Sequence, residues 1–198
     1  MNETASCGPK DKIRRLVRAR VKEIPAEQRE AFARAACAHM VQALSFRRAE
    51  LVLAYMPLPM ECSPLPLVEA ARKLHKRVAF PLCLPEGRLA LYEADGEACF
   101  MRGSFGIQEP IPRKCRLVMP EEIDFAVIPG VVFDKSCNRM GRGAGYYDRM
   151  LPRLGGKKAG LCFDVQVLEQ IPMEKWDIPM DFLATNNGII VKNGHSCL

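Results

Sequence analysis

The sequence predicts an α/β fold in which a largely parallel, mixed sheet lies between two helical layers. Helical and strand patterns alternate along the chain, which is typical of such sheets. Residues 123–134 form an almost continuous apolar run, as expected of a strand that is covered on both faces. The 198 residues, 48% of them apolar, can form one core. We therefore expect a single domain over residues 1–198, a three-layer α/β/α sandwich with flexible tails at 1–8 and 191–198.

The first half of the chain begins with two predicted helices. In the first, residues 10–22, Ile13, Val17 and Val21 recur at helical spacing among basic residues. The second helix begins near Pro25 and runs to Leu44. Further along, the patterns predict a strand over 50–58, a helix over 63–76 and a strand over 77–83.

The second half contains more strands. Residues 87–94 and 97–107 are expected to form a short antiparallel pair, and 108–122 a loop. The buried strand 123–134 comes next, then a helix over 146–154 and strands over 157–163 and 185–191. In Rossmann-like sheets of this kind, ligands bind beyond the carboxyl ends of the strands.

Charge and cysteine usage limit the classes of function. The net charge is +6, and residues 10–22 contain seven Lys or Arg against one Asp. This basic helix could be a solvated face, a nucleic-acid surface or a site for a small polyanion, but no aromatic residue is interleaved with the cations, which disfavours nucleic acid. The nine cysteines are odd in number and form no C-x-x-C pair, which argues against a zinc site and a complete disulfide framework. We expect a reducing, cytoplasmic location with no membrane association.

The segment "GRGAGYYDRM", residues 141–150, follows the buried strand and leads into a predicted helix. Glycines before a helix allow backbone N–H groups to approach phosphate oxygens. Neither standard nucleotide-binding glycine pattern is present, so a tight structural turn is an equal alternative. Arg139 and Arg142 could bind phosphates, and Asp148 offers a hard oxygen ligand for Mg²⁺, which together favour a phosphate loop.

The run "PGVVFDKSCNRMGRGAGYYDRML" resembles the signature of the 5-formyltetrahydrofolate cyclo-ligase family. Three other elements match in order: "KDKIR" near the amino terminus, "AYMPLPMECS" with its glutamate, and "FGIQEP". A late acidic element, "WDIPMDFL", is also similar. The resemblance therefore covers nearly the whole chain.

Membership would imply ATP- and Mg²⁺-dependent cyclisation of 5-formyltetrahydrofolate to 5,10-methenyltetrahydrofolate, with release of ADP and phosphate through a phosphorylated formyl intermediate. In such a reaction the protein supplies positioning and charge stabilisation rather than a covalent nucleophile. The implied partners are ATP and the folate, which could carry a polyglutamate tail, and we expect a monomer.

The resemblance also implies site residues. Arg142, Tyr146 and Asp148 are implied as catalytic, and Asp148 with Asp177 as the metal ligands. Positions implied to contact ATP are Lys10, Arg14, Arg139, Met140, Gly141, Arg142, Gly143, Ala144, Gly145, Tyr146 and Tyr147. Positions implied to contact the folate are Met56, Glu61, Phe105, Arg142, Gly143, Ala144, Gly145 and Tyr146.

Three residues depart from the family pattern. Cys137 stands where glycine is usual, and because a Cβ resists positive φ we expect a turn of different shape. Ala144 often corresponds to Lys or Gly, and Trp176 to the His of a His-Asp pair. A non-catalytic nucleotide- or folate-binding paralogue is the main alternative, although its mark would be loss of Asp148, Glu61 or the loop glycines. A sugar-phosphate isomerase or CoA transferase of related fold would need a carboxylate base or nucleophile.

Overall fold

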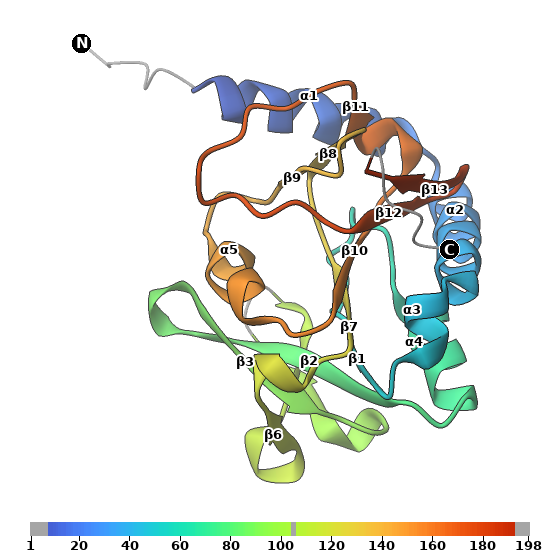
Figure 1. Ribbon diagram of the computed structural model, residues 1–198, viewed down its shortest axis with the longest axis vertical. Helices are drawn as coiled ribbons and strands as arrows, with labels where there is room; N and C mark the ends of the chain where they lie inside the picture. The colour runs from blue at the N-terminus through green and yellow to red at the C-terminus, as the bar shows by residue number, and fades with distance from the viewer. Residues whose placement is uncertain (1–7, 104–105, 193–198) are drawn as a thin grey trace.

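An eight-stranded sheet forms the centre of the computed structural model, which describes residues 8–103 and 106–192 (Figure 1). The strand order is β13-β12-β10-β7-β1-β2-β3-β6. The five neighbours from β12 to β2 are mutually parallel, and β13, β3 and β6 pair antiparallel, which confirms the predicted mixed sheet. The strands are β1 (Leu51–Leu53), β2 (Arg77–Leu84), β3 (Arg88–Glu93), β6 (Arg116–Val118), β7 (Phe125–Ile128), β10 (Lys157–Leu161), β12 (Phe182–Thr185) and β13 (Gly188–Val191).

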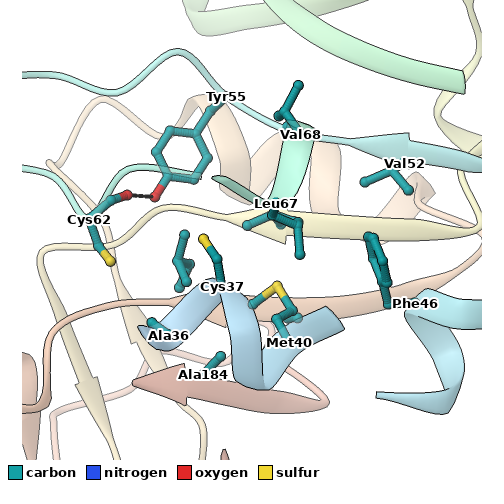
Figure 2. Packing of buried hydrophobic residues seen from close by; sticks show 14 of the residues in the cluster. Ala36, Cys37, Met40, Phe46, Val52, Tyr55, Cys62, Leu67, Val68 and Ala184 are labelled. Atoms are coloured by element: carbon teal, nitrogen blue, oxygen red, sulfur yellow. Dashed lines mark hydrogen bonds between the residues drawn. The ribbon is translucent and has the colours of Figure 1, made fainter. Parts of the chain in front are cut away.

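Three helices form one outer layer: α2 (Ala26–Gln42), α3 (Leu44–Arg48) and α4 (Leu65–Lys73) (Figure 1). Their buried side chains meet those of the parallel strands, as Figure 2 shows for Cys37, Met40 and Phe46. The rings of Phe46 and Phe125 pack edge to face with centroids 5.6 Å apart. The predicted second helix ends at Gln42, because Ala43 is extended and a separate short helix follows.

The opposite face of the sheet is covered by shorter elements. They are α5 (Tyr146–Met150), the 3-10 helix η6 (Leu151–Arg153) and a three-stranded sheet of β8 (Val132–Asp134), β9 (Arg139–Met140) and β11 (Val167–Leu168). The basic helix α1 (Pro9–Glu23) packs on this small sheet through Val17, which is fully buried beside Met140 and Val132. The three-layer arrangement is confirmed, but this layer is less helical than predicted.

The predicted pairing of 87–94 with 97–107 is wrong. β3 pairs with β2 across a tight connection at Pro85–Gly87 and, on its other side, with β6. The later segment contributes β4 (Phe100–Arg102), which pairs with β5 (Gln108–Pro110) in a separate two-stranded sheet. With β2 on one edge and β6 on the other, β3 has no free edge for β4. Residues 108–122, predicted as a loop, therefore contain two strands.

The predicted strand 123–134 is interrupted at Pro129 and Gly130. β7 ends at Ile128 in the central sheet, and β8 begins at Val132 in the small sheet. Proline lacks the N–H that a central strand needs. A Cβ at Gly130 would lie 3.1 Å from Cγ of Arg139 and closer still to the Phe133 ring. The break redirects the chain towards the glycine-rich loop of residues 141–145, which we call the phosphate loop after its expected ligand.

Several boundaries differ from the predicted ones. The helix predicted over 146–154 becomes 3-10 after Met150, and 185–191 forms the turn and second strand of the β12–β13 hairpin. Gly8, assigned to a tail, is the N-cap of α1, and Val191 ends β13. Lys192 is exposed, and the remaining residues of both predicted tails lie outside the described part of the chain. Within the described parts of the chain, no helix combines the length and apolar character needed to cross a membrane.

The carboxylate of Asp134, fully buried at the end of β8, holds together the turn that leads to β9. Its Oδ1 accepts the backbone N–H groups of Ser136 and Asn138, at 2.9 and 3.0 Å. Its Oδ2 accepts Nδ2 of Asn138 at 2.9 Å and the backbone N–H of Ile171 at 3.1 Å. One side chain thus fixes both the start of the phosphate loop and the segment near residue 171.

We predict that Asp134→Asn lowers the free energy of unfolding by about 3 kcal/mol, because an amide NH₂ would face backbone donors in a buried site. For a chain of this size, that corresponds to a fall in Tm of roughly 6–12 °C. Thermal unfolding measures it. Glu169→Gln is the matched control, because Glu169 is exposed and pairs with Lys135 beside the same turn. Equal transitions for the two variants would contradict the role of Asp134.

Candidate active site

A cavity of about 520 Å³ lies beyond the carboxyl ends of the parallel strands β1, β2 and β7. The phosphate loop and the start of α5 form one wall, and apolar residues from the strand ends form the other. Its lining comprises Tyr55, Met56, Leu58, Glu61, Pro81, Cys83, Leu89, Ile107, Pro129, Gly130, Arg139, Gly141, Arg142, Gly143, Ala144, Gly145, Tyr146, Tyr147 and Asp148. This is the position at which α/β sheets bind ligands.

A second cavity of about 580 Å³ lies at the amino ends of β1, β7, β10 and β12. Its carboxylates already hold the backbone: Asp124 Oδ2 accepts the N–H groups of Glu50 and Leu51 at 2.9 and 2.8 Å, and Asp181 Oδ2 accepts that of Lys158. These acids stabilise strand starts. The cavity at the carboxyl ends is therefore the better candidate, although it is the smaller one.

The phosphate loop has the backbone conformation that only glycine adopts easily. Gly143 and Gly145 have φ values of +105° and +73°, and Gly145 is the N-cap of α5. Arg14 of α1 braces the loop, because its Nε donates to the Gly141 carbonyl at 2.8 Å. On the other side, Nη1 of Arg149 donates to the Ala144 carbonyl at 3.1 Å. Hydrogen bonds from two guanidinium groups thus hold the backbone of the loop on both sides.

The side chain of Arg139 is buried beneath the loop, with only 3% of its surface exposed. Its Nη2 donates to Oδ1 of Asp148, and Nη1 donates to the Pro129 carbonyl at 3.1 Å. The guanidinium lies 5.7 Å from the centre of the Tyr147 ring. Burial lowers the pKa of Arg139, and the charge of Asp148 opposes this effect. Nε has no hydrogen-bond partner among the described residues.

Lys10 and Asp177, implied as a nucleotide contact and a metal ligand, bind each other in this structure. The Nζ of Lys10 lies 3.2 Å from Oδ2 of Asp177 and 3.5 Å from Oε1 of Glu174. The negative charges of Asp148 and, to a lesser extent, Asp177 both raise the pKa of the buried Arg139 guanidinium against the effect of burial. The described residues include no cluster of three His, Cys, Asp or Glu that could enclose a metal ion alone.

Glu61 lies on the opposite wall, on a loop that is fixed to the core. Tyr55 donates its hydroxyl hydrogen to the Cys62 carbonyl, as Figure 2 shows. Oε2 of Glu61 accepts the Leu58 N–H at 3.0 Å, and Oε1 lies 3.4 Å from Nη1 of Arg142. Burial raises the pKa of the Glu61 carboxyl, and its hydrogen bonds with Leu58 and Arg142 partly oppose this. Arg142 therefore links the phosphate loop to this wall.

The structure brings most of the implied residues together, with exceptions. Lys10, Arg14 and Asp177 lie behind the loop rather than in the cavity lining, and Met140 is buried against α1. Phe105 lies outside the described residues. Tyr146 and Tyr147 both line the cavity. Adjacent helical residues point in different directions, and only Tyr147 also packs against the core beneath α5.

Sequence reasoning missed two parts of the site. Arg18 lies one helical turn after Arg14, and burial lowers its pKa, an effect to which the charges of Arg142 and Arg14 add. The basic run gave no means of separating Arg18 from its solvated neighbours. The apolar wall was also missed, because residues such as Pro81, Cys83 and Leu89 have ordinary strand patterns.

Cys137 adopts the positive φ that its Cβ was expected to resist. Cys137 has φ +62°, the left-handed conformation that glycine would adopt there. Its side chain is fully buried, and Sγ donates to the Ile190 carbonyl at 3.5 Å. Packing and the hydrogen bonds of Asp134 therefore hold the turn in its shape despite the Cβ.

Comparison with known proteins agrees with this geometry. A sequence model described as the 5-formyltetrahydrofolate cyclo-ligase family matches residues 7–186. The chain belongs to this family. The 5-formyltetrahydrofolate cyclo-ligase of Escherichia coli K12 is 28% identical over 176 residues, covering 86% of this chain and 96% of the relative. A protein named probable 5-formyltetrahydrofolate cyclo-ligase in Schizosaccharomyces pombe is 29% identical over 171 residues, covering 78% and 83%.

Solved structures of cyclo-ligase relatives share the fold. The 5,10-methenyltetrahydrofolate synthetase of Aquifex aeolicus superposes with a TM-score of 0.83 at 32% identity, over 96% of this chain and 95% of the other. That of Mycoplasma pneumoniae has a TM-score of 0.74 at 18% identity, over 90% and 99%, a likeness of fold alone. The chain is thus an enzyme of the cyclo-ligase family with an α/β single-domain fold.

For this cyclo-ligase we predict that Asp148→Asn lowers the free energy of unfolding by about 2 kcal/mol, because the buried Arg139 would lose its charged partner. The cost is below that of a fully buried pair, since 37% of the Asp148 side chain is exposed. Urea denaturation measures it. The control is Glu121→Gln, which removes an exposed pair with Arg153 and should change little. A stability equal to the control would mean that Arg139 does not need Asp148.

Proposed function

We propose that the protein catalyses the ATP- and Mg²⁺-dependent cyclisation of 5-formyltetrahydrofolate to 5,10-methenyltetrahydrofolate, with release of ADP and phosphate. The observation that carries the proposal is the contact between Arg142 and Glu61, with Nη1 and Oε1 3.4 Å apart. It places a phosphate-loop cation against the acid on the opposite, mainly apolar wall of the cavity. A site that joins a phosphate donor to a folate needs this adjacency.

In the proposed reaction, the formyl oxygen attacks the γ-phosphorus and the bond to ADP breaks. N10 of the folate then attacks the activated carbon, a C–N bond forms, the C–O bond to phosphate breaks, and N10 loses its proton. Negative charge accumulates on the transferred phosphoryl group, and catalysis of such transfers is mainly positioning and charge stabilisation. Arg142 and the loop N–H groups would stabilise that negative charge, and Tyr146 lines the cavity between them and the opposite wall.

The nucleotide phosphates would bind the loop Gly141–Gly145, with Arg14, Arg139 and Lys10 around it. Arg14 and Lys10 both come from the first turns of α1, and each already lies within hydrogen-bond reach of a loop or acidic partner. Burial and the charges of Arg142 and Arg14 lower the pKa of Arg18, although Asp11 pairs with Arg14 at 2.6 Å and partly offsets this repulsion. A triphosphate fits this charge distribution.

The residues present fit a Mg²⁺ ion that arrives with the nucleotide. Magnesium is usually held by one or two carboxylates together with substrate phosphates, rather than by a cage of protein ligands. Asp148 and Asp177 would hold it, and the ion would neutralise phosphate charge. Both carboxylates have cationic partners, Arg139 and Lys10, whose charges would lie near the bound phosphates.

The folate would occupy the cavity between the loop and the strand ends. Glu61, with 18% of its side chain exposed, could accept paired hydrogen bonds from pterin N–H groups, which would offset the cost of burying a carboxylate. Met56 and Tyr55 line the same wall. We expect the enzyme to act as a monomer. The seven described cysteines are free thiols, which supports a cytoplasmic location.

The alternative is a non-catalytic paralogue that binds ATP or the folate. The two differ in turnover, so the direct test is to follow the absorbance of the methenyl product after adding 5-formyltetrahydrofolate and ATP with Mg²⁺. We predict product formation that stops when EDTA removes the metal and resumes when Mg²⁺ is restored. Binding of either ligand by calorimetry without any product would instead identify the paralogue.

The raised pKa of Glu61 predicts a pH dependence. In the free enzyme the carboxyl titrates above its ordinary value of 4.5, so it protonates as the pH falls through that raised value and loses its acceptor capacity. We predict that kcat/KM for the folate falls on the acid side with a midpoint above 4.5. Glu61→Gln should lower kcat/KM and abolish this acid limb, while the KM for ATP changes little. An identical limb in the variant would assign the titration to another group.

A further inference from the structure

A tight turn over residues 174–177 lies against the amino end of α1. The N–H of Asp177 donates to the Glu174 carbonyl at 3.1 Å, and the N–H of Glu174 donates to Oδ2 of Asp177 at 2.8 Å. Lys10 of α1 bridges both acids, at 3.2 and 3.5 Å. The turn is therefore closed by its own hydrogen bonds and tied to the helix by an ammonium group.

The chain on both sides of this turn is also anchored. Ile171 is 3% exposed and packs with Val17 and Met140, and its N–H donates to Asp134. After the turn, Met180 is buried, and its N–H donates to the Cys137 carbonyl at 2.8 Å. The backbone that carries residues 174–177 is thus fixed in position by the core.

Trp176 occupies the third position of this turn, and 68% of its surface is exposed. It is the only tryptophan in the chain. Large aromatic side chains usually bury most of their surface, because each carries a large apolar area. A fixed backbone that presents a bare indole ring resembles the stacking surfaces on which proteins bind nucleobases.

The neighbours of Trp176 connect it to the phosphate loop. Asp177, the next residue, has 14% of its side chain exposed, and its charge acts on Arg139 beneath the loop. Lys10 lies between the turn and α1, the helix whose Arg14 holds Gly141. If the phosphates bind the loop and Lys10, the ribose places the base some distance from the loop. Because Lys10 contacts the turn 174–177, the base can lie near this turn.

We propose that the indole ring of Trp176 is the surface on which the purine base of the nucleotide stacks, an inference that rests on the proposed function. Stacking requires only a π-face, so it favours any purine and does not by itself select adenine over guanine. In this arrangement the base and the phosphates are bound by different residues, Trp176 and the phosphate loop. The side chain acts on nucleotide affinity and touches neither the folate nor the reacting atoms.

Because Trp176 is the only tryptophan, the indole fluorescence of the wild-type protein reports on it alone. We predict that ATP, ADP and GTP quench this fluorescence with saturation. Inorganic tripolyphosphate, at concentrations where it inhibits turnover competitively against ATP, should leave it nearly unchanged. Equal quenching by tripolyphosphate would overturn the proposal, since the signal would then report charge or movement of the turn.

Steady-state kinetics provide the second arm. Trp176→Ala should raise the KM for ATP by about tenfold, as expected for the loss of one base-stacking contact. The kcat and the KM for the folate should stay within about twofold, and Trp176→Phe should recover most of the affinity. The matched control is Lys175→Ala in the same turn, which should leave the KM for ATP unchanged. Thermal unfolding of Trp176→Ala should match the wild type, because the side chain is exposed.

Different results would contradict the stacking role of Trp176 and the proposed enzymatic function. ATP-dependent turnover with an unchanged KM for ATP in Trp176→Ala would overturn the stacking role and leave the proposed function intact. No turnover and no ATP binding by the wild type would overturn both. A self-association that Trp176→Ala abolishes, measured by sedimentation without nucleotide, would overturn the proposal by assigning the ring to a protein contact.

Discussion

The buried carboxylate of Asp134 is the constraint on which the site depends. It accepts four N–H groups, two from the turn at Ser136 and Asn138, one from the Asn138 side chain and one from Ile171. A carboxylate without these donors could not remain in the core, and the donors without the carboxylate would be unpaired. It thereby fixes two segments: β9 with the phosphate loop that follows it, and the chain that carries Asp177.

A second feature of the site is that its charges neutralise one another in the absence of ligands. The Asp148 carboxylate binds Arg139, Asp177 binds Lys10, and Glu61 contacts Arg142. Each pair contains one group suited to phosphate and one suited to a metal or an N–H donor. Binding of a Mg–nucleotide complex would exchange these partners rather than bury unpaired charge, which is a less costly change. The site is therefore organised before its ligands arrive.

The interruption of the strand at Pro129 and Gly130 determines where Arg139 and the phosphate loop lie. A continuous strand would have carried Phe133 and Asp134 further along the central sheet. Instead the chain crosses to the small sheet on which α1 packs, and Arg139 returns beneath the loop to donate to the Pro129 carbonyl. The helix with Lys10 and Arg14 thus meets the loop because a proline cannot complete the central ladder.

The sequence by itself determined the alternation of elements, the buried central strands, the glycine loop before a helix and the motif residues. Each depends on neighbours in the chain: apolar periodicity, proline and glycine chemistry, and residue spacing. It did not determine which strand β3 would pair with, that 108–122 contains strands, or that Cys137 would adopt positive φ. It also could not distinguish Arg18 from Arg15 and Arg20, or reveal that the acids and cations of the site pair with each other. Only the tertiary structure decided these, because strand partners, exposed fractions and charge contacts are set by residues distant in sequence, such as Lys10 and Asp177.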